Sequence, residues 1–133
     1  MAKKVIIADD EPVVREVVKQ VLQAEGYEVI EAENGQEAVE QVGKLNPDLV
    51  ILDVRMPVLD GMQACRLIRQ MDEPVRNVPI IILTAVDTSL GRRLGAEWGA
   101  DLYLVKPISP RLLRQKIKEL IGPPHEEQSE TQK

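Results

Sequence analysis

Aromatic residues are almost missing from this sequence of 133 residues: they make up 2% of it, and phenylalanine does not occur. Proteins that bind single-stranded nucleic acid stack the bases on aromatic side chains, so this scarcity argues against such a platform. The formal net charge is −5, from 17 Lys and Arg against 22 Asp and Glu, which would on average repel a nucleic-acid backbone or an anionic membrane. We therefore expect no direct contact with nucleic acid and no binding to a membrane.

Cysteine and long apolar runs are equally scarce. Cys65 is the only cysteine, so no disulfide can form within the chain. No apolar stretch approaches the roughly 20 residues that a membrane-spanning helix needs. The first residues, Met-Ala-Lys-Lys, lead directly into an apolar run without the pattern of a signal peptide. These features predict a protein of the reducing cytoplasm, and its length and 44% hydrophobic content predict one domain.

Short runs rich in β-branched residues alternate with segments of helical period. The runs predict five strands, Val5–Ala8, Tyr27–Ala32, Asp48–Leu52, Pro79–Leu83 and Asp101–Val105. Between them, apolar residues recur at the spacing of one helix face, and Asp60 and Ser109 are expected to be N-caps. Strict β-α alternation with right-handed crossovers predicts an α/β fold, a doubly wound five-stranded parallel sheet in the flavodoxin-like order 2-1-3-4-5.

Acidic residues follow two of the predicted strands. Asp9, Asp10 and Glu11 come directly after the first run, and Asp53 follows the third. In the order 2-1-3-4-5 these two strands are neighbours at the switch point, so their carboxylates should converge where ligands bind in such folds. Like charges repel unless a cation or protons intervene. The sequence therefore predicts a divalent metal, Mg²⁺ or alternatively Mn²⁺, because oxygen donors suit these ions and no Cys/His cluster exists for zinc.

Two further polar residues end strands on the same side: Thr84 after the fourth run and Lys106 after the fifth. A hydroxyl, an ammonium group and a metal site around a carboxylate suit a phosphoryl group attached to that carboxylate. Phosphoryl transfer depends mainly on positioning and on charge neutralisation. We therefore expect one edge of the sheet to carry phosphoryl chemistry.

The combination of motifs resembles the receiver domain of two-component response regulators, a CheY-like domain. The resemblance covers about residues 3 to 121, so residues 1–121 are expected to form the domain and 122–133 a polar, flexible tail or truncated linker. It is carried by Asp9-Asp10, Leu52-Asp53-Val54-Arg55-Met56-Pro57, Asp60-Gly61, Thr84-Ala85, Gly99-Ala100-Asp101 and Lys106-Pro107. Each motif alone is weak, but the set in this order is highly specific.

The resemblance implies a role for each matching residue around the metal. Asp53 would be the nucleophile that takes phosphate from a phosphohistidine. Asp10 would bind Mg²⁺ directly and Asp9 through water, while Asp53 and the backbone carbonyl of Arg55 would supply further ligands. The chain would be a self-phosphorylating phosphoacceptor with slow autodephosphorylation, not a turnover enzyme on a small-molecule substrate.

The resemblance also implies how the phosphoryl group is sensed. Lys106 would pair with a phosphoryl oxygen, Thr84 would move toward another, and Tyr103 would change rotamer with Thr84. Pro107 is a candidate for a cis peptide bond. The helix near Ser89–Trp98, the strand of Tyr103 and the last helix would form the output face, and the two glycines of that helix should make it easy to rearrange.

The partners follow from the position of the only histidine, His125, which lies in the predicted tail. Phosphate would come from a histidine kinase, a histidine phosphotransfer protein or a small phosphodonor, and the signal would pass to a downstream protein target. We expect a monomer or a phosphorylation-dependent dimer, although Leu102 stands where one dimeric subgroup has an acid. Arg55 and Val86 occupy positions that tune phosphate lifetime in the family.

Three alternatives compete with this interpretation. A haloacid dehalogenase-type hydrolase needs a second acid two residues after its nucleophile, and here Arg55 occupies that position. A flavodoxin-like cofactor binder would want a Gly/Ser/Thr-rich phosphate loop where this chain has Asp9, Asp10 and Glu11. A phosphorylation-independent, receiver-like interaction module remains open.

Overall fold

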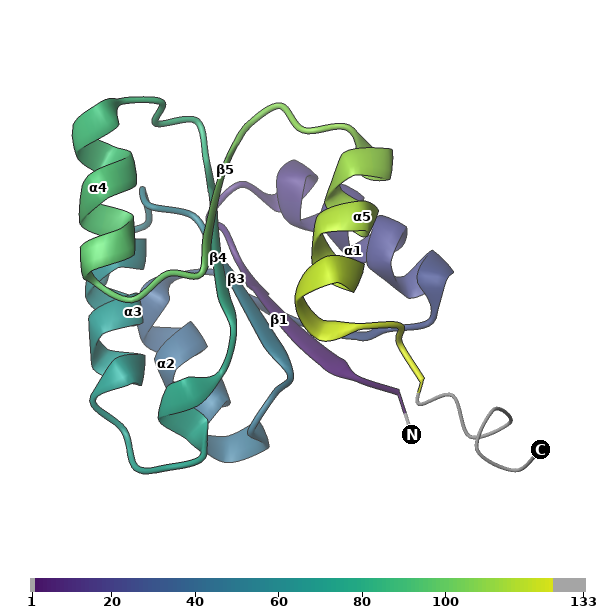
Figure 1. Cartoon of the computed structure of the whole chain (residues 1–133), viewed down its shortest axis with the longest axis horizontal. Helices are drawn as coiled ribbons and strands as arrows, with labels where there is room; N and C mark the ends of the chain where they lie inside the picture. Colours follow the sequence, from purple (N-terminus) through teal and green to yellow (C-terminus); the bar gives the residue numbers. More distant parts are fainter. Residues whose placement is uncertain (1, 126–133) are drawn as a thin grey trace.

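The computed structural model describes residues 2–125. It contains one sheet of five parallel strands, whose order β2-β1-β3-β4-β5 confirms the predicted fold (Figure 1). Each predicted strand is present, with both bounds within one residue of the prediction. The strands are β1 (Lys4–Ala8), β2 (Glu28–Ala32), β3 (Leu49–Leu52), β4 (Ile80–Thr84) and β5 (Leu102–Val105).

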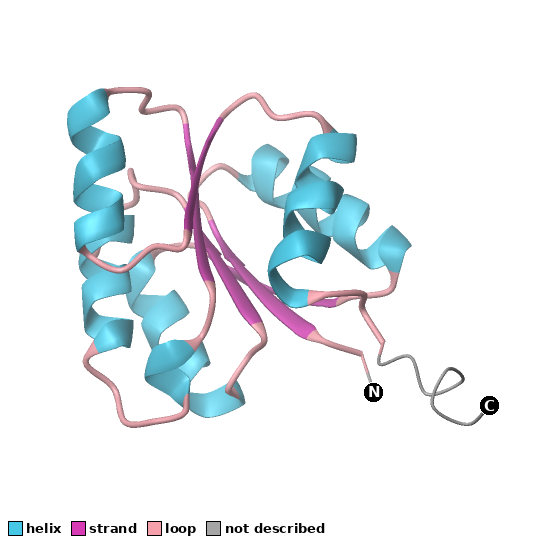
Figure 2. Cartoon of the chain, in the orientation of Figure 1, coloured by secondary structure: helices cyan, strands magenta, loops and turns pink. Residues whose placement is uncertain are grey.

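Helices cover both faces of the sheet (Figure 2). The helices α1 (Pro12–Glu25) and α5 (Pro110–Ile121) lie on one face, packed against each other. The other face carries α2 (Gly35–Leu45), α3 (Gly61–Arg69) and α4 (Ser89–Glu97), and the 3₁₀-helix η1 (Val75–Asn77) precedes β4. None of the helices in this part of the chain has both the length and the apolar character that crossing a bilayer requires.

The core has two apolar layers because side chains alternate across each strand. Ile6 and Ala8 of β1 pack toward α2 and α3, whereas Val5 and Ile7 pack toward α1 and α5. Every residue of β3 and β4 is buried, as expected for central strands covered on both faces. A sheet so enclosed leaves only its two ends for chemistry.

Capping residues fix where the helices begin. Asp60 accepts a hydrogen bond from the backbone of Gln63, whose side chain bonds back to Asp60, and Ser109 accepts one from the backbone of Leu112. Both predicted N-caps are confirmed. These caps set the entry of α3 and α5 beside the carboxyl ends of β3 and β5.

The first residues of the predicted tail pack against the domain. The backbone N–H of Lys3 donates to the Pro124 carbonyl at 2.8 Å, and the Tyr27 hydroxyl donates to the Gly122 carbonyl at 2.8 Å. Ordered contacts thus extend past the expected boundary at residue 121. Residues 126–133 lie outside the described part of the chain, so the flexible tail stays a prediction there.

Candidate functional site

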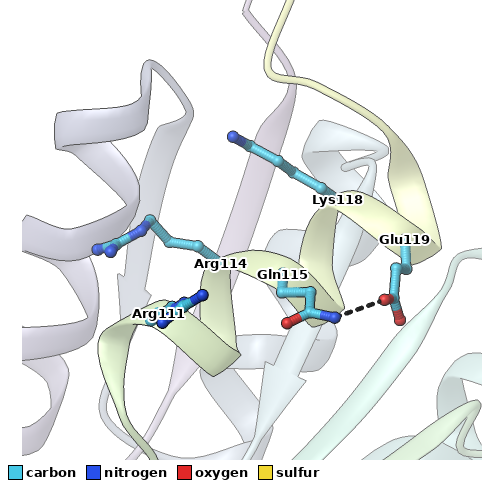
Figure 3. A pocket seen from close by; sticks show the side chains of 5 residues that line it. All are labelled: Arg111, Arg114, Gln115, Lys118 and Glu119. Carbon is cyan, nitrogen blue, oxygen red and sulfur yellow. Dashed lines mark hydrogen bonds between the residues drawn. The ribbon is translucent and has the colours of Figure 1, made fainter.

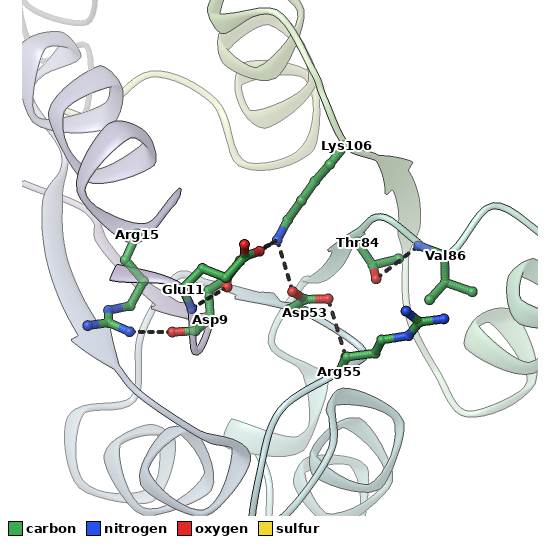
Figure 4. Close-up of polar contacts among 8 residues, drawn as sticks. All are labelled: Asp9, Glu11, Arg15, Asp53, Arg55, Thr84, Val86 and Lys106. Carbon is green, nitrogen blue, oxygen red and sulfur yellow. Dashed lines mark hydrogen bonds and ion pairs between the residues drawn. The ribbon is translucent and has the colours of Figure 1, made fainter. Parts of the chain in front are cut away.

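Polar side chains gather at the carboxyl end of the sheet (Figure 4). Asp9 follows β1, Asp53 follows β3, Thr84 is the last residue of β4 and Lys106 follows β5. Within residues 2–125, Asp9, Asp53 and Thr84 are the only buried polar or charged residues, at 1%, 5% and 1% exposure. Burying polar groups costs free energy unless they gain partners, so this concentration at one edge marks a site.

Three carboxylates form the acidic part of the site. One oxygen each from Asp9, Asp10 and Asp53 lie within 4.8 Å of one another. Asp9 and Asp53 are buried and Asp10 is exposed, so the cluster opens to solvent on one side. Clustered carboxylate oxygens with room for water are the donors that Mg²⁺ prefers. The residues present therefore fit a magnesium ion.

Lys106 is the counter-ion of this cluster. Its ammonium nitrogen lies 2.6 Å from Asp9 Oδ2, 2.9 Å from Asp53 Oδ2 and 3.4 Å from Glu11 Oε1. Burial acts to lower the pKa of Lys106, but hydrogen bonds to Asp9 and Asp53 outweigh it and hold the pKa above its ordinary value. Lys106 is thus a permanent cation, and one cation does not balance the carboxylates around it.

The pKa of Asp9 is raised within this cluster. Burial raises the pKa of its carboxyl, opposed by hydrogen bonds from Lys106 and from the backbone N–H of Glu11. The negative charge of Asp53 raises the pKa further. A cation placed between these acids would relieve the repulsion.

Arg55 lines the hollow between the acids and Thr84. Its backbone N–H lies 3.3 Å from Asp53 Oδ1, a weak hydrogen bond that orients the Asp53 carboxylate (Figure 4). Its carbonyl as a metal ligand stays a prediction. The peptide bond between Lys106 and Pro107 is cis, the geometry considered for Pro107, and an unforeseen second cis bond precedes Pro74.

Thr84 and Tyr103 meet at one residue, Val86. The Thr84 hydroxyl accepts a 3.3 Å hydrogen bond from the Val86 N–H, and the Tyr103 hydroxyl donates to the Val86 carbonyl at 2.6 Å. The two side chains that the family resemblance pairs are therefore joined through the backbone of a third residue. The sequence could not show this connection.

Two glycines of α4 make room for Tyr103. A Cβ on Gly91 would lie 2.9 Å from the Tyr103 hydroxyl oxygen, and one on Gly95 would lie 3.0 Å from Tyr103 Cδ2. From the sequence, these glycines are expected only to weaken the helix. The structure adds that they let α4 pack closely over the tyrosine ring.

The loop between β3 and α3 is fixed by two further glycines. A Cβ on Gly61 would lie 2.0 Å from the Asp53 carbonyl oxygen, and one on Gly35 would lie 2.1 Å from the Leu59 carbonyl oxygen. Val58, at the exposed tip of this loop, has a φ of +70°, which is strained for a β-branched residue. Close backbone packing thus holds the position of Asp53.

Cys65 and His125 take no part in this site. Cys65 is fully buried, its Sγ donates to the Trp98 carbonyl at 3.2 Å, and burial raises its pKa to about 11, so this thiol is part of the core. His125 lies beside Gly26, and Gly26 belongs to the turn that leads from α1 into the amino end of β2. It is at the opposite end of the sheet from the acids.

Further hollows lie on the surface outside the acidic site. The outer side of α5 carries Arg111, Arg114 and Lys118 beside Gln115 and Glu119 (Figure 3). It belongs to a single helix, and its Lys118 is paired with Glu25 at 2.8 Å. An apolar groove lies between α1 and the loop after β5, and Glu11 and Lys106 line both this groove and the acidic hollow.

The fold and the site together define a class of protein, a flavodoxin-like α/β domain with an acidic cluster at its switch point. The sequence profile described as the response regulator receiver domain matches residues 5–118. The chain therefore belongs to the response regulator receiver domain family.

Individual relatives are similar over most of this chain. It is 39% identical over 121 residues to the alkaline phosphatase synthesis transcriptional regulatory protein PhoP of Bacillus subtilis, a match that covers 91% of this chain. The same match covers 49% of PhoP, so the chain spans about half the length of that relative.

Solved structures agree in fold. The chemotaxis protein CheY4 of Vibrio cholerae matches with a TM-score of 0.84 and 32% identity over 90% of this chain and 99% of its own. The receiver domain of sensor histidine kinase PA1611 of Pseudomonas aeruginosa matches with a TM-score of 0.84 and 34% identity, covering 92% of this chain and 99% of its own. That structure has a magnesium ion coordinated in its active-site cleft.

Proposed function

We propose that this receiver accepts a phosphoryl group on Asp53 from a phosphohistidine of a partner protein, with Mg²⁺ as cofactor. One observation carries the proposal: the buried polar residues of the described chain, Asp9, Asp53 and Thr84, gather around Lys106 at one edge of the sheet. Such a cluster is costly for folding alone, because an apolar edge would need no counter-ions. Its residue types are those that phosphoryl transfer uses.

The transfer step follows from the positions of these groups. An Asp53 carboxylate oxygen attacks the phosphorus, the new O–P bond forms as the P–N bond of phosphohistidine breaks, and the imidazole nitrogen keeps the electron pair and takes a proton from solvent. Lys106, already 2.9 Å from Asp53 Oδ2, neutralises the phosphoryl oxygens that arrive there. Asp9, Asp10 and Asp53 would hold Mg²⁺, which would supply further charge neutralisation.

The signal would start at Thr84. An aspartyl phosphate adds about −1.5 to −2 charges and three acceptor oxygens. The Thr84 hydroxyl can donate to one of them at little cost, because its present bond with the Val86 N–H is long, at 3.3 Å. Any shift of Val86 alters the carbonyl that holds Tyr103 beneath α4, so α4, β5 and α5 form the proposed output face toward a downstream protein.

The apolar groove beside the site suits a helix of the phosphodonor. Val13 and Val17 of α1 are 76% and 51% exposed, and the groove shares Glu11 and Lys106 with the acidic hollow. A partner helix that packs on these valines would bring a phosphohistidine to Asp53. Histidine kinases and histidine phosphotransfer proteins are the proposed donors, acting in the cytoplasm on a monomer or a phosphorylation-dependent dimer.

Labelling by acetyl phosphate tests the proposal. In Mg²⁺ the wild type should gain one phosphoryl group by intact mass, and chelation with EDTA or the change Asp53→Asn should abolish the gain. Asp48→Asn, a change at the other end of the sheet, should still be labelled. Labelling of Asp53→Asn to the wild-type level, or of the wild type in EDTA, would refute the proposal.

The alternative is a receiver-like module that signals without phosphate. It draws on one observation: Lys106 already pairs with both Asp9 and Asp53, so the edge is partly neutralised as it stands. A wild type that binds Mg²⁺ but takes no phosphoryl group from any donor would favour this alternative.

A further inference from the structure

Arg15 reaches back from α1 to the loop that carries the acids (Figure 4). Helical side chains lean toward the N-terminus of their helix, so a residue in the first turns can contact the loop before it. The Arg15 guanidinium donates to the backbone carbonyl of Asp9 at 2.5 Å, and only 11% of its side chain is exposed. Arg15 lies outside the motifs that carry the family resemblance.

We propose that Arg15 is a positioning residue for the divalent cation: it fixes the peptide plane between Asp9 and Asp10 and thereby the direction of the Asp10 carboxylate. The inference rests on the proposed function of this edge as a metal site. It adds a residue that touches neither the cation nor the phosphoryl group.

The backbone carbonyl of Asp9 is the group that Arg15 holds in place. The Asp9 N–H donates to the Ala32 carbonyl at 3.2 Å, and its carboxylate is held by Lys106 at 2.6 Å and by the N–H of Glu11 at 2.9 Å. Its carbonyl lies beyond the end of β1, outside the ladder of the sheet, and Arg15 is its partner. That hydrogen bond sets how the next peptide is turned.

Asp10 depends on this peptide plane. Its carboxylate forms no hydrogen bond or ion pair with the described residues 2–125, although it is one of the three acids within 4.8 Å. The backbone and the rotamer of Asp10 itself therefore direct its carboxylate toward Asp9 and Asp53, without help from another side chain of residues 2–125. A ligand residue without side-chain partners needs a fixed backbone to present its oxygen.

Glu31 of β2 anchors Arg15 from the other side. Glu31 Oε1 lies 3.3 Å from Arg15 Nε, and Glu31 Oε2 lies 3.0 Å from Lys19 Nζ. The fork of the guanidinium lets Arg15 bond Glu31 and the Asp9 carbonyl at the same time, which a lysine cannot do in the same geometry. Lys19 shares Glu31 but has no contact with Asp9, so it offers a matched control.

Positioning and electrostatics predict opposite signs. Arg15 is a positive charge near a cation site, so removing it would tighten Mg²⁺ binding if charge alone mattered. If Arg15 positions Asp10, removing it weakens binding. Losses of about 10- to 100-fold in metal affinity are typical when a residue that orients a ligand is replaced.

The experiment is a calorimetric Mg²⁺ titration, repeated with Mn²⁺ and electron paramagnetic resonance, on wild type, Arg15→Met, Arg15→Lys and Lys19→Met. We expect Arg15→Met to raise the dissociation constant about 10-fold or more, Arg15→Lys to recover part of the loss, and Lys19→Met to stay near wild type. Circular dichroism checks that each variant is folded at the titration temperature. Glu31→Gln, which keeps Arg15 but weakens its anchor, gives an intermediate loss and replaces Arg15→Met if that variant does not fold.

The possible outcomes separate the two proposals. Wild type without Mg²⁺ binding would refute the proposed function and this inference with it. Wild type that binds, together with a folded Arg15→Met that binds equally well or more tightly, would overturn the role of Arg15 alone. Equal weakening by Lys19→Met and Arg15→Met would assign the effect to Glu31, which both side chains contact, and would also overturn the role of Arg15.

Discussion

The two ends of the sheet use aspartate in different ways. At the amino end, Asp48 Oδ2 accepts the backbone N–H of Lys4 at 2.8 Å, and Asp101 Oδ2 accepts that of Ile80 at 2.8 Å. Each of these acids caps the start of a neighbouring strand. At the carboxyl end, Asp10 has no such partner among residues 2–125, and Asp9 and Asp53 share one lysine.

The difference shows how a structural acid can be told from a functional one. Asp48 and Asp101 satisfy backbone donors that would otherwise lack partners, so their bonding is complete without a ligand. The acids of the carboxyl end outnumber the one lysine that pairs with them, and in the proposed function a divalent cation supplies the missing positive charge. Residue type and burial alone do not make this distinction, because the partners decide it.

The largest effect should come from disturbing the backbone that holds Asp53. In Gly61→Ala the new Cβ would lie 2.0 Å from the Asp53 carbonyl oxygen, so the loop must shift. We expect a loss of about 3–5 kcal/mol in the free energy of unfolding, the size of effect reserved for severe steric conflict, together with weaker Mg²⁺ binding. Urea denaturation and metal titration measure the two effects.

Gly43→Ala is the matched control for that change. Gly43 lies in α2, and a Cβ there would meet nothing within 4 Å. The same substitution should therefore stabilise the protein by up to about 1 kcal/mol through helix propensity. Similar stability losses in both variants would show that close packing at Gly61 is not what holds the loop.

Arg69→Ala should destabilise the amino end and spare the site. The Arg69 guanidinium donates to the carbonyls of Gly99, Arg76 and Val78 and to Asp101, tying α3 to the turn between α4 and β5. Losing these bonds should cost about 2–4 kcal/mol, because carbonyls that are partly buried lose a charged donor. Urea denaturation measures this loss. An Mg²⁺ affinity that falls along with stability would contradict the prediction that the two ends of the sheet are independent.

The smallest expected effect concerns how the free energy of unfolding changes at acid pH. A hydrogen bond from Lys19, the largest cause, and a weaker one from Arg15 hold the pKa of Glu31 below its usual 4.5. A lowered folded-state pKa adds stability above the unfolded-state pKa, and that stability is lost as the pH falls through the folded-state pKa. Since Glu31 is one-third exposed, we expect Glu31→Gln to cost only a few tenths of a kcal/mol at pH 7, and less as the pH falls below about 4.

Thermal unfolding from pH 3 to 7 checks this prediction. The wild type and Glu31→Gln should converge at the acid end of the range. A difference that grows toward low pH would contradict the assignment of the shift to these ion pairs.

Sequence reasoning predicted the sheet order, the strands and the caps because these follow from local pattern and chain connectivity. Asp60 and Ser109 can be recognised as N-caps from a window of four residues, because each cap bonds a backbone N–H within that window. The meeting of Asp9, Asp10 and Asp53 was also predicted, because parallel strands bring their carboxyl ends to one edge.

Contacts made across elements could not be predicted in this way. The hydrogen bond from Arg15 to the Asp9 carbonyl depends on the rotation of α1 about its own axis. The packing of Tyr103 against Gly91 and Gly95 depends on how closely α4 lies to the sheet. A single arginine or glycine in a helix is compatible with many such arrangements. Packing of the whole domain selects one of them.

Magnesium titration of Asp10→Asn and Asp48→Asn tests the central claim most directly, because each removes one carboxylate charge from opposite ends of the same sheet. The account predicts that Asp10→Asn loses Mg²⁺ binding and keeps its stability in EDTA, whereas Asp48→Asn binds Mg²⁺ like the wild type and unfolds at lower urea. Equal Mg²⁺ affinity in the two variants would contradict it.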